Sequence, residues 1–117
     1  MKTKIPVEGE PMDEPIIVST TLEERGDAER LARLLLEKKL IACAQILGPT
    51  QSLYWWQGEI AEASEVLLAM KTDRSLFPRI EQLIKAEHPY QVPEIVATAI
   101  ICGSSEYLGW LAGELAS

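Results

Sequence analysis

Several residue types are scarce in this sequence of 117 residues, and each scarcity limits what the protein can do. His88 is the single histidine, so a Ser-His-Asp or Cys-His catalytic system has only this residue to build on. No glycine-rich loop of the phosphate-binding type is present. Eleven basic residues stand against eighteen acidic ones, and this balance disfavours binding to phosphate backbones. We expect no nucleic-acid partner, and nothing in the sequence argues for an enzyme.

Long apolar runs are also missing. The longest one, residues 95–102, is far too short to cross a bilayer and contains Thr98. Residues 1–10 lack the apolar stretch of an export signal. Without such a signal, the two cysteines are expected to be free thiols in a reducing compartment. The sequence therefore predicts a cytoplasmic protein with no membrane partner.

The length and the apolar share of 47% are typical of one globular domain. Residues 1–14 are polar and rich in turn-forming residues, so we predict an N-terminal arm there and a single domain over residues 15–117. The β-branched run at 15–20 predicts a strand. In residues 26–39 apolar side chains recur at i, i+3, i+4 and i+7, which predicts an amphipathic helix.

Residues 41–71 are expected to form one long β-hairpin. Gly48-Pro49 interrupts its first strand and predicts a bulge or bend. Gln57-Gly58 supplies the tight turn, because glycine tolerates positive φ. Three glutamates of the returning strand are spaced by three, alternate between faces and are expected to be solvated: Glu59, Glu62 and Glu65.

A second helix is expected over residues 75–87 with Ser75 as its N-cap, because the proline three residues later fits only the first helical turn. A strand at 94–102 follows, and a final helix begins at a cap formed by Ser104 or Ser105. The order β-α-β-β-α-β with a terminal helix predicts an α+β protein of the ferredoxin-like class. Its sheet is antiparallel, with an extended hairpin between the second and third strands.

The cysteines of this topology are expected to lie far apart. Cys43 and Cys102 fall on the second and fourth strands, which lie at opposite edges of a ferredoxin-like sheet. Three strand steps of ~4.8 Å separate them by roughly 14 Å. A disulfide requires Cα atoms within about 7 Å, so we predict no bridge between them.

The predicted sheet has more apolar side chains than two helices can cover. Residues 94–102 are apolar on both faces, whereas helices cover only one face of a ferredoxin-like sheet. Self-association would cover the second face; the alternative is a monomer covered by its own last helix. Tyr54, Trp55 and Trp56 gather at the hairpin tip, and we expect them to contact another subunit. A stacking platform for a ligand is the alternative role for these aromatic rings.

Several segments, taken together, resemble the CutA divalent-cation-tolerance family. They are Ser19-Thr20, Leu40-Ile41-Ala42-Cys43-Ala44, Ser52-Leu53-Tyr54-Trp55-Trp56-Gln57-Gly58, His88-Pro89-Tyr90-Gln91-Val92-Pro93-Glu94-Ile95 and, in the last helix, Tyr107-Leu108-x-Trp110-Leu111. The resemblance spans residues 15–112, nearly the whole domain. It implies a cytosolic homotrimer of ferredoxin-like subunits that binds copper or another divalent ion, with a role in metal tolerance or signalling.

The resemblance also implies a position for a metal site. Copper-binding relatives use a cysteine where this chain has Ser19 and a His-His pair where it has Glu87-His88. Because a hydroxyl and a carboxylate replace softer donors, selectivity for Cu(I) is weakened. We therefore expect at most weak binding of copper or zinc through Glu87 and His88. The alternative is that His88 is a helix-terminal cation stabilised by the helix dipole.

A second candidate site is a ligand pocket at a subunit junction, to which Ser19 also belongs. Lys71 closes the returning strand, and Tyr90, Glu94 and Tyr107 are expected to converge near its level. A lysine, a carboxylate and phenols suit a small anion or metabolite, although a structural ion pair with core aromatics is the alternative. Two other functions thus stay open: a PII-like sensor of small metabolites or nucleotides, and a structural scaffold without catalysis.

Overall fold

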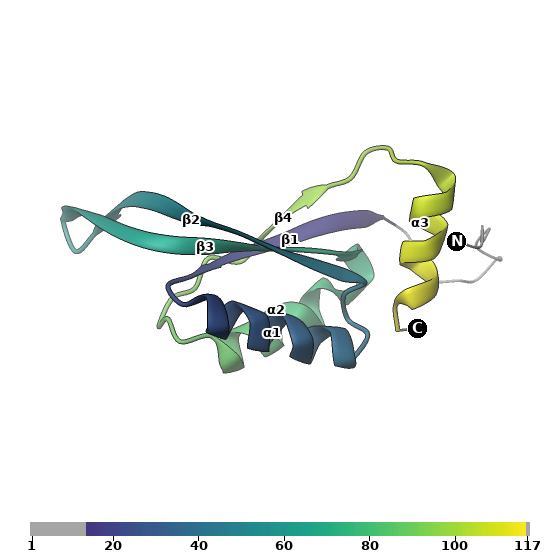
Figure 1. The fold of residues 1–117 in the computed structure, drawn as a ribbon, viewed down its shortest axis with the longest axis horizontal. Helices are drawn as coiled ribbons and strands as arrows, with labels where there is room; N and C mark the ends of the chain where they lie inside the picture. Colours follow the sequence, from purple (N-terminus) through teal and green to yellow (C-terminus); the bar gives the residue numbers. More distant parts are fainter. Residues whose placement is uncertain (1–13, 117) are drawn as a thin grey trace.

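The computed structural model describes residues 14–116, in which the strands and helices follow one another in the order that the sequence predicts. The elements, shown in Figure 1, are β1 (Pro15–Leu22), α1 (Arg25–Glu37), β2 (Cys43–Trp56), β3 (Glu59–Asp73), α2 (Phe77–Glu87), β4 (Val96–Ala99) and α3 (Ser105–Glu114). The predicted N-terminal arm lies outside the described residues except for Glu14. Within the described range, every helix is too short or too polar to cross a bilayer.

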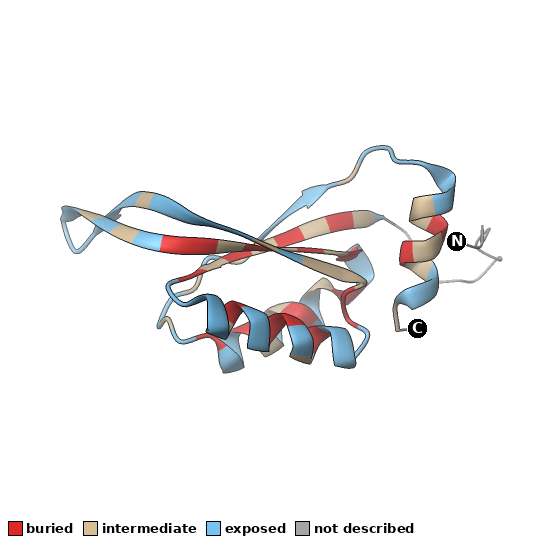
Figure 2. Ribbon diagram, in the orientation of Figure 1, coloured by how far each residue is buried: buried red, intermediate tan, exposed pale blue. Residues whose placement is uncertain are grey.

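The strands form one antiparallel sheet in the order β2-β3-β1-β4, which confirms the predicted α+β class. Helices α1 and α2 cover one face of this sheet (Figure 1). The residues of β1 alternate between buried and half-buried, and the buried set faces the helices (Figure 2). We call the opposite side of the sheet the helix-free face. The largest fully buried apolar side chains of the core are Val18, Leu22, Leu35, Ile41, Leu68, Met70, Ile80 and Ile84.

The hairpin of β2 and β3 extends well beyond the helices and contains the predicted irregularity. The strand register shifts between Leu47 and Thr50. Gly48 has a φ of +142°, and a Cβ at this position would lie 3.0 Å from the carbonyl oxygen of Glu65. Because the backbone of β3 passes so close, only glycine fits at the bend. At the tip, the turn residues Gln57 and Gly58 both have positive φ, as the tight turn requires.

The start of the second helix differs from the prediction. Asp73, not Ser75, acts as the cap, since its Oδ2 accepts a hydrogen bond of 2.9 Å from the backbone N–H of Ser75. Residues Arg74–Leu76 form a 3₁₀ turn, and α2 begins only at Phe77. The aspartate also accepts from the Glu14 N–H at 2.9 Å, so it joins the start of β1 to the end of β3.

The last strand is shorter than predicted. Of residues 94–102, only Val96–Ala99 form β4, because this edge strand pairs with β1 alone. One further hydrogen bond, from the Ile100 N–H to the Pro15 carbonyl, ends the pairing. Cys102 follows β4 while Cys43 begins β2, at opposite edges of the sheet as predicted, and both are free thiols.

The terminal helix α3 begins where one of the two predicted caps places it. The Ser104 hydroxyl accepts a hydrogen bond of 3.2 Å from the Tyr107 N–H. The helix lies at the end of the sheet where β2 begins (Figure 1), and it buries Leu111. Its last residues return to α1, since the Ala116 N–H donates to the Lys39 carbonyl at 2.8 Å. Because α3 sits at this end, it leaves the rest of the helix-free face open.

Candidate functional site

The residues predicted to share one pocket lie in two separate places. Lys71 and Tyr107 are neighbours, with the lysine Nζ 5.5 Å from the centre of the tyrosine ring. Tyr90 instead donates its hydroxyl hydrogen to Glu65 Oε2 at 2.5 Å. Glu65 and Lys71 are both on β3, six residues or roughly 20 Å apart at ~3.3 Å per residue. The predicted convergence of Tyr90 with Lys71 is therefore wrong, and Glu94 is exposed before β4.

The first place, which we call the Lys71 cluster, lies on the helix-free face beside α3 and contains Cys43, Gln45, Lys71 and Tyr107. Cys43 is paired directly with Lys71 across the strands, and its Sγ lies 3.7 Å from the Tyr107 hydroxyl. The Lys71 ammonium donates to Gln45 Oε1 at 3.3 Å. Burial raises the pKa of Tyr107, and the thiol beside it acts in the same direction. The phenol therefore stays protonated at neutral pH and can donate a hydrogen bond.

Ser19 lies on the same helix-free face as Lys71 but outside direct contact in the strand register. It is paired with Ala69 on one side and with Val96 on the other. Lys71 is two residues beyond Ala69 on β3, so the two polar side chains are diagonal neighbours across adjacent strands. The structure thus places Lys71 beside Tyr107 at one end of the helix-free face, with Ser19 farther along the same face.

The second place, the Tyr90 cluster, contains Thr21, Glu65, His88 and Tyr90. The His88 Nε2–H donates to the Thr21 carbonyl at 2.8 Å, and the Tyr90 N–H donates to His88 Nδ1 at 3.0 Å. Nε2 must carry a hydrogen to donate to a carbonyl, and Nδ1 must be unprotonated to accept a hydrogen bond. The imidazole is therefore neutral, with its hydrogen on Nε2. Burial lowers the pKa of His88, although the Thr21 carbonyl and the Glu65 carboxylate oppose this.

Glu65 is the member of this cluster that sequence reasoning missed. It was expected to be solvated, but only 6% of its surface is exposed. Burial raises the pKa of this carboxyl, and hydrogen bonds from Ser52, Tyr90 and Thr21 outweigh burial, so that the net pKa is lowered. Burial also raises the pKa of the Tyr90 phenol. The Gly48-Pro49 bend, which lies beside Glu65, is the one sequence signal for this position. The partner Tyr90 gives no signal, because it comes from a loop that is distant in sequence.

Glu87 and His88 of a single chain do not form a metal site by themselves. Glu87 is exposed, and both nitrogens of the His88 ring already have backbone partners. In the part of the chain that the structure describes, no group of three or more His, Cys, Asp or Glu side chains is arranged to hold a metal. The neutral ring also differs from the helix-terminal cation given as the alternative. His88 ends α2 through its backbone N–H, which donates to Ile84, while its ring ties the helix end to β1.

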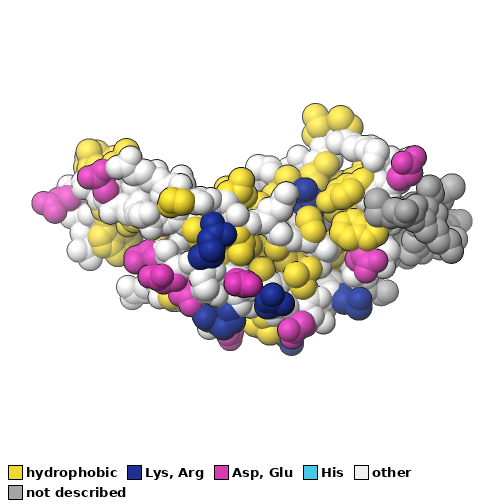
Figure 3. Space-filling view, viewed as in Figure 1, with side chains coloured by type: hydrophobic (Ala, Val, Ile, Leu, Met, Phe, Trp, Pro, Cys, Tyr) yellow, Lys and Arg dark blue, Asp and Glu magenta, His cyan; other side chains and the backbone are white. Residues whose placement is uncertain are grey.

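Exposed apolar side chains lie in two places, on the helix-free face and at the hairpin tip. Figure 3 shows hydrophobic side chains both at the tip and along the sheet. At the tip, 73% of Trp55, 62% of Leu53 and 65% of Ile60 are exposed, and Tyr54 and Trp56 beside them are also exposed. On the face itself, the exposed large side chains are Leu47 and Val96. This exposure leaves the sequence-predicted contact residues available to another molecule.

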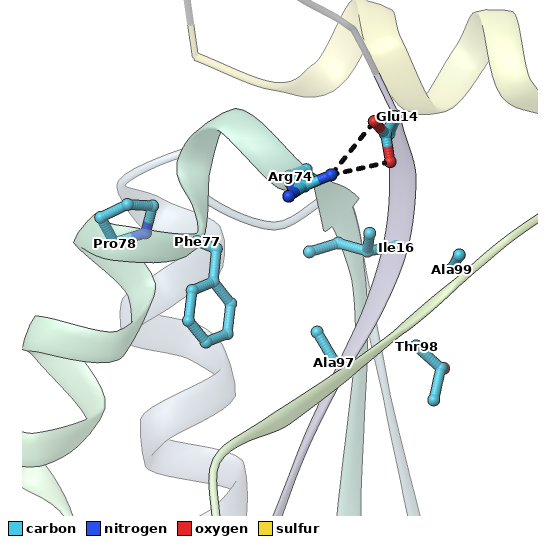
Figure 4. A pocket seen from close by; sticks show the side chains of 8 residues that line it. All are labelled: Glu14, Ile16, Arg74, Phe77, Pro78, Ala97, Thr98 and Ala99. Atoms are coloured by element: carbon cyan, nitrogen blue, oxygen red, sulfur yellow. Dashed lines mark hydrogen bonds and ion pairs between the residues drawn. The ribbon is translucent and has the colours of Figure 1, made fainter.

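A shallow groove lies on the other side of the sheet, between the start of α2 and the β4 edge (Figure 4). It has a volume of about 410 Å³, and Ile16, Phe77 and Ala97 give it an apolar floor. At one end Arg74 Nη1 pairs with Glu14 at 3.2 Å. The groove contains none of the residues that the sequence singled out, and its charged groups already neutralise each other.

A profile of the CutA1 divalent ion tolerance proteins matches residues 16–114. The chain belongs to the CutA1 family. The family accounts for both the sheet order and the long hairpin, since solved CutA1 structures share this fold.

The CutA divalent-cation tolerance protein of Thermus thermophilus is 44% identical over 100 residues, which cover 86% of this chain and 95% of that protein. A solved CutA1 structure from the same organism superposes with a TM-score of 0.85 at 41% identity, covering 87% of this chain and 99% of the other. The CutA homologue of Danio rerio is 44% identical over 85 residues, 73% of this chain but only 57% of that protein. The chain thus spans little more than half of the Danio relative.

One solved relative bears on the expected cellular location. A CutA structure from Archaeoglobus fulgidus, described as periplasmic, superposes with a TM-score of 0.83 at 37% identity over 86% of this chain and 97% of that one. Membership of the CutA1 family therefore does not by itself assign this chain to the cytoplasm.

Proposed function

We propose that the protein works as a homotrimer whose subunits associate through the helix-free face and the hairpin tip. The observation that carries this proposal is the exposure of Trp55, Leu53 and Ile60 on a hairpin that reaches beyond the rest of the chain. Monomeric soluble proteins rarely expose large contiguous apolar surfaces, and buried aromatic side chains dominate the energy of interfaces.

The exposed apolar side chains of the hairpin tip and of the helix-free face differ in kind, and this difference favours a ring. The hairpin tip contributes aromatic rings, whereas Leu47 and Val96 on the sheet contribute aliphatic side chains. If the tip of one copy packs on the sheet of the next, the contact is heterologous, and such contacts form a ring when the rotation between copies closes. The number of subunits that we propose, three, is the one that the resemblance to CutA implies.

We also propose that the assembled trimer binds a divalent cation such as copper or zinc and so contributes to metal tolerance. The names of the Thermus and other CutA relatives support a role in divalent-cation tolerance. Residues 14–116 of one chain hold no cluster of three donors, and we propose that a neighbouring subunit supplies some of the ligands. Glu87 has a free carboxylate for this purpose, while His88 would first have to give up a backbone hydrogen bond.

Binding rather than catalysis is the activity that we propose, in the cytoplasm. The neutral His88 ring has no free nitrogen with which to take a proton from a serine or cysteine nucleophile. Cys102 is an exposed free thiol, which favours a reducing compartment.

Light scattering and calorimetry on the same samples test both proposals. Trp55→Ala should lower the molar mass at micromolar concentration, whereas the control Leu36→Ala removes an exposed apolar side chain from α1 and should leave it unchanged. Calorimetric titration with Zn²⁺ or Cu²⁺ should show binding to the trimer and its loss in the dissociated variant. Equal binding by trimer and monomer would contradict shared ligands. A trimer that binds neither ion would favour the scaffold or the metabolite sensor.

A further inference from the structure

Within residues 14–116, Lys71 is a cation on an apolar face without an opposite charge beside it. It alternates along β3 with the buried residues Met70 and Thr72, so its side chain lies on the helix-free face. Its hydrogen-bond partners are both neutral, the amide of Gln45 and the hydroxyl of Tyr107, and the Tyr107 ring lies beside it. The ion pairs found within residues 14–116 join other side chains, and none includes Lys71.

Tyr107 adds a second hydrogen-bond donor at the same position. Its hydroxyl lies 3.7 Å from the thiol of Cys43, a weak acceptor, and its oxygen also accepts a hydrogen bond from the Lys71 ammonium. Burial raises the pKa of this phenol, so the hydroxyl keeps its hydrogen. An ammonium from β3 and a phenol from α3 therefore meet at the Lys71 cluster, and no described side chain offers either of them an anionic acceptor.

Assembly makes this arrangement unfavourable unless an anion is present. In the single chain Lys71 is half-buried and reaches water. When another subunit covers the helix-free face, the ammonium loses part of this hydration, and burying an unpaired charge is strongly unfavourable. We propose that Lys71 and Tyr107 bind a small oxyanion, a carboxylate or a phosphate, at the junction between subunits. The proposal rests on the assembly proposed above.

The charge of the whole protein makes such a site selective. With a net charge of −7, the surface repels anions in general, so a small anion is retained only where a local cation and hydrogen-bond donors hold it. Lys71 supplies the charge, and the Tyr107 hydroxyl supplies a directed hydrogen bond to the second oxygen of the ligand. Cys43 and Gln45, on β2, border the ligand on the side away from β1.

Thermal unfolding of the full chain tests the site with inorganic phosphate and acetate as probes, against sodium chloride of equal ionic strength. A ligand that binds only the folded state raises the melting temperature. We expect at least one of the two probes to raise it for the unaltered chain, and the stronger probe identifies the class of oxyanion. The increase should disappear in Lys71→Gln, shrink in Tyr107→Phe and persist in Lys71→Arg and in the control Lys38→Gln, which alters an exposed lysine after α1.

Light scattering on the same samples separates this proposal from the assembly. If the protein is a trimer and neither probe changes its melting temperature, the anion site is refuted and the proposed assembly is not affected. If Lys71→Gln also dissociates that trimer, then Lys71 pairs with a carboxylate of the neighbouring subunit. This result refutes the proposal that a free anion is bound. An increase that survives in Lys71→Gln places the ion elsewhere and also refutes the site. A monomer that shows the increase and loses it in Lys71→Gln overturns the assembly and the junction, although Lys71 still binds the anion.

Discussion

Replacing Tyr90 by phenylalanine removes one hydrogen bond to a buried carboxylate and nothing else. The Tyr90 hydroxyl lies 2.5 Å from Glu65 Oε2, and the glutamate is 6% exposed, so water cannot easily replace the lost donor. Hydrogen bonds to charged groups stabilise proteins by about 1.5–3 kcal/mol. Because Ser52 and Thr21 continue to donate to Glu65, we expect Tyr90→Phe to lower the free energy of unfolding by about 2 kcal/mol at neutral pH.

The loss should depend on pH in a direction that the pKa of Glu65 fixes. The carboxyl has a lower pKa in the folded state than its ordinary value of 4.5, so its hydrogen bonds contribute stability above that value. This contribution is lost as the pH falls through the folded-state pKa. The difference between the unaltered chain and Tyr90→Phe should therefore be full at neutral pH and shrink below pH 4.5.

Urea denaturation at fixed protein concentration measures this difference, because the stability of an oligomer depends on concentration. Tyr107→Phe, measured in chloride buffer, is the matched control: it removes a hydroxyl whose partners are the Cys43 thiol at 3.7 Å and the half-buried Lys71, for which water can replace the lost acceptor. It should cost less than Tyr90→Phe. Equal losses in the two variants, or a loss in Tyr90→Phe that is the same at acidic and neutral pH, would refute the charged hydrogen bond.

Two further predictions concern His88 and the hairpin bend. The pKa of His88 is lower in the folded state than its ordinary 6.5, so the unfolded chain binds more protons and stability should decline as the pH falls below 6.5. His88→Gln should flatten this decline in thermal unfolding curves; an unchanged slope would contradict the neutral ring. Gly48→Ala should lower stability by about 1–3 kcal/mol through strain and the close Glu65 carbonyl. In the control Gly26→Ala the added Cβ has no atom within 4 Å, so the urea midpoint should stay unchanged or rise. Equal effects of Gly48→Ala and Gly26→Ala would contradict the requirement for glycine at the bend.

Much of the fold could be predicted because its signals are local. The alternating burial of β1 and the helical spacing of α1 follow from which face of each element meets the core. The hairpin turn follows from Gln57-Gly58, since positive φ leaves few alternatives. Two boundaries were missed for reasons that are not local. The length of β4 is set by its single neighbour β1, and Asp73 caps the 3₁₀ turn because it also holds Glu14.

The candidate site was only partly predictable for a related reason. Lys71 and Tyr107 meet because β3 ends where α3 packs, and both ends could be read from the sequence. Tyr90 was placed with them because the path of the loop before β4 has no signature of its own. That loop brings Tyr90 to Glu65 instead, beside the bend at Gly48. The role of His88 depends on two backbone partners, and residue type alone does not reveal them.

The claim that copies of this chain cover the helix-free face is tested most directly by the molar mass of the unaltered protein. Size-exclusion chromatography with light scattering at micromolar concentration should give three chains of 13.0 kDa, about 39 kDa in total, and the value should persist on dilution. A mass of 13.0 kDa under these conditions would mean that the exposed aromatic hairpin stays in water, and it would contradict the proposed assembly.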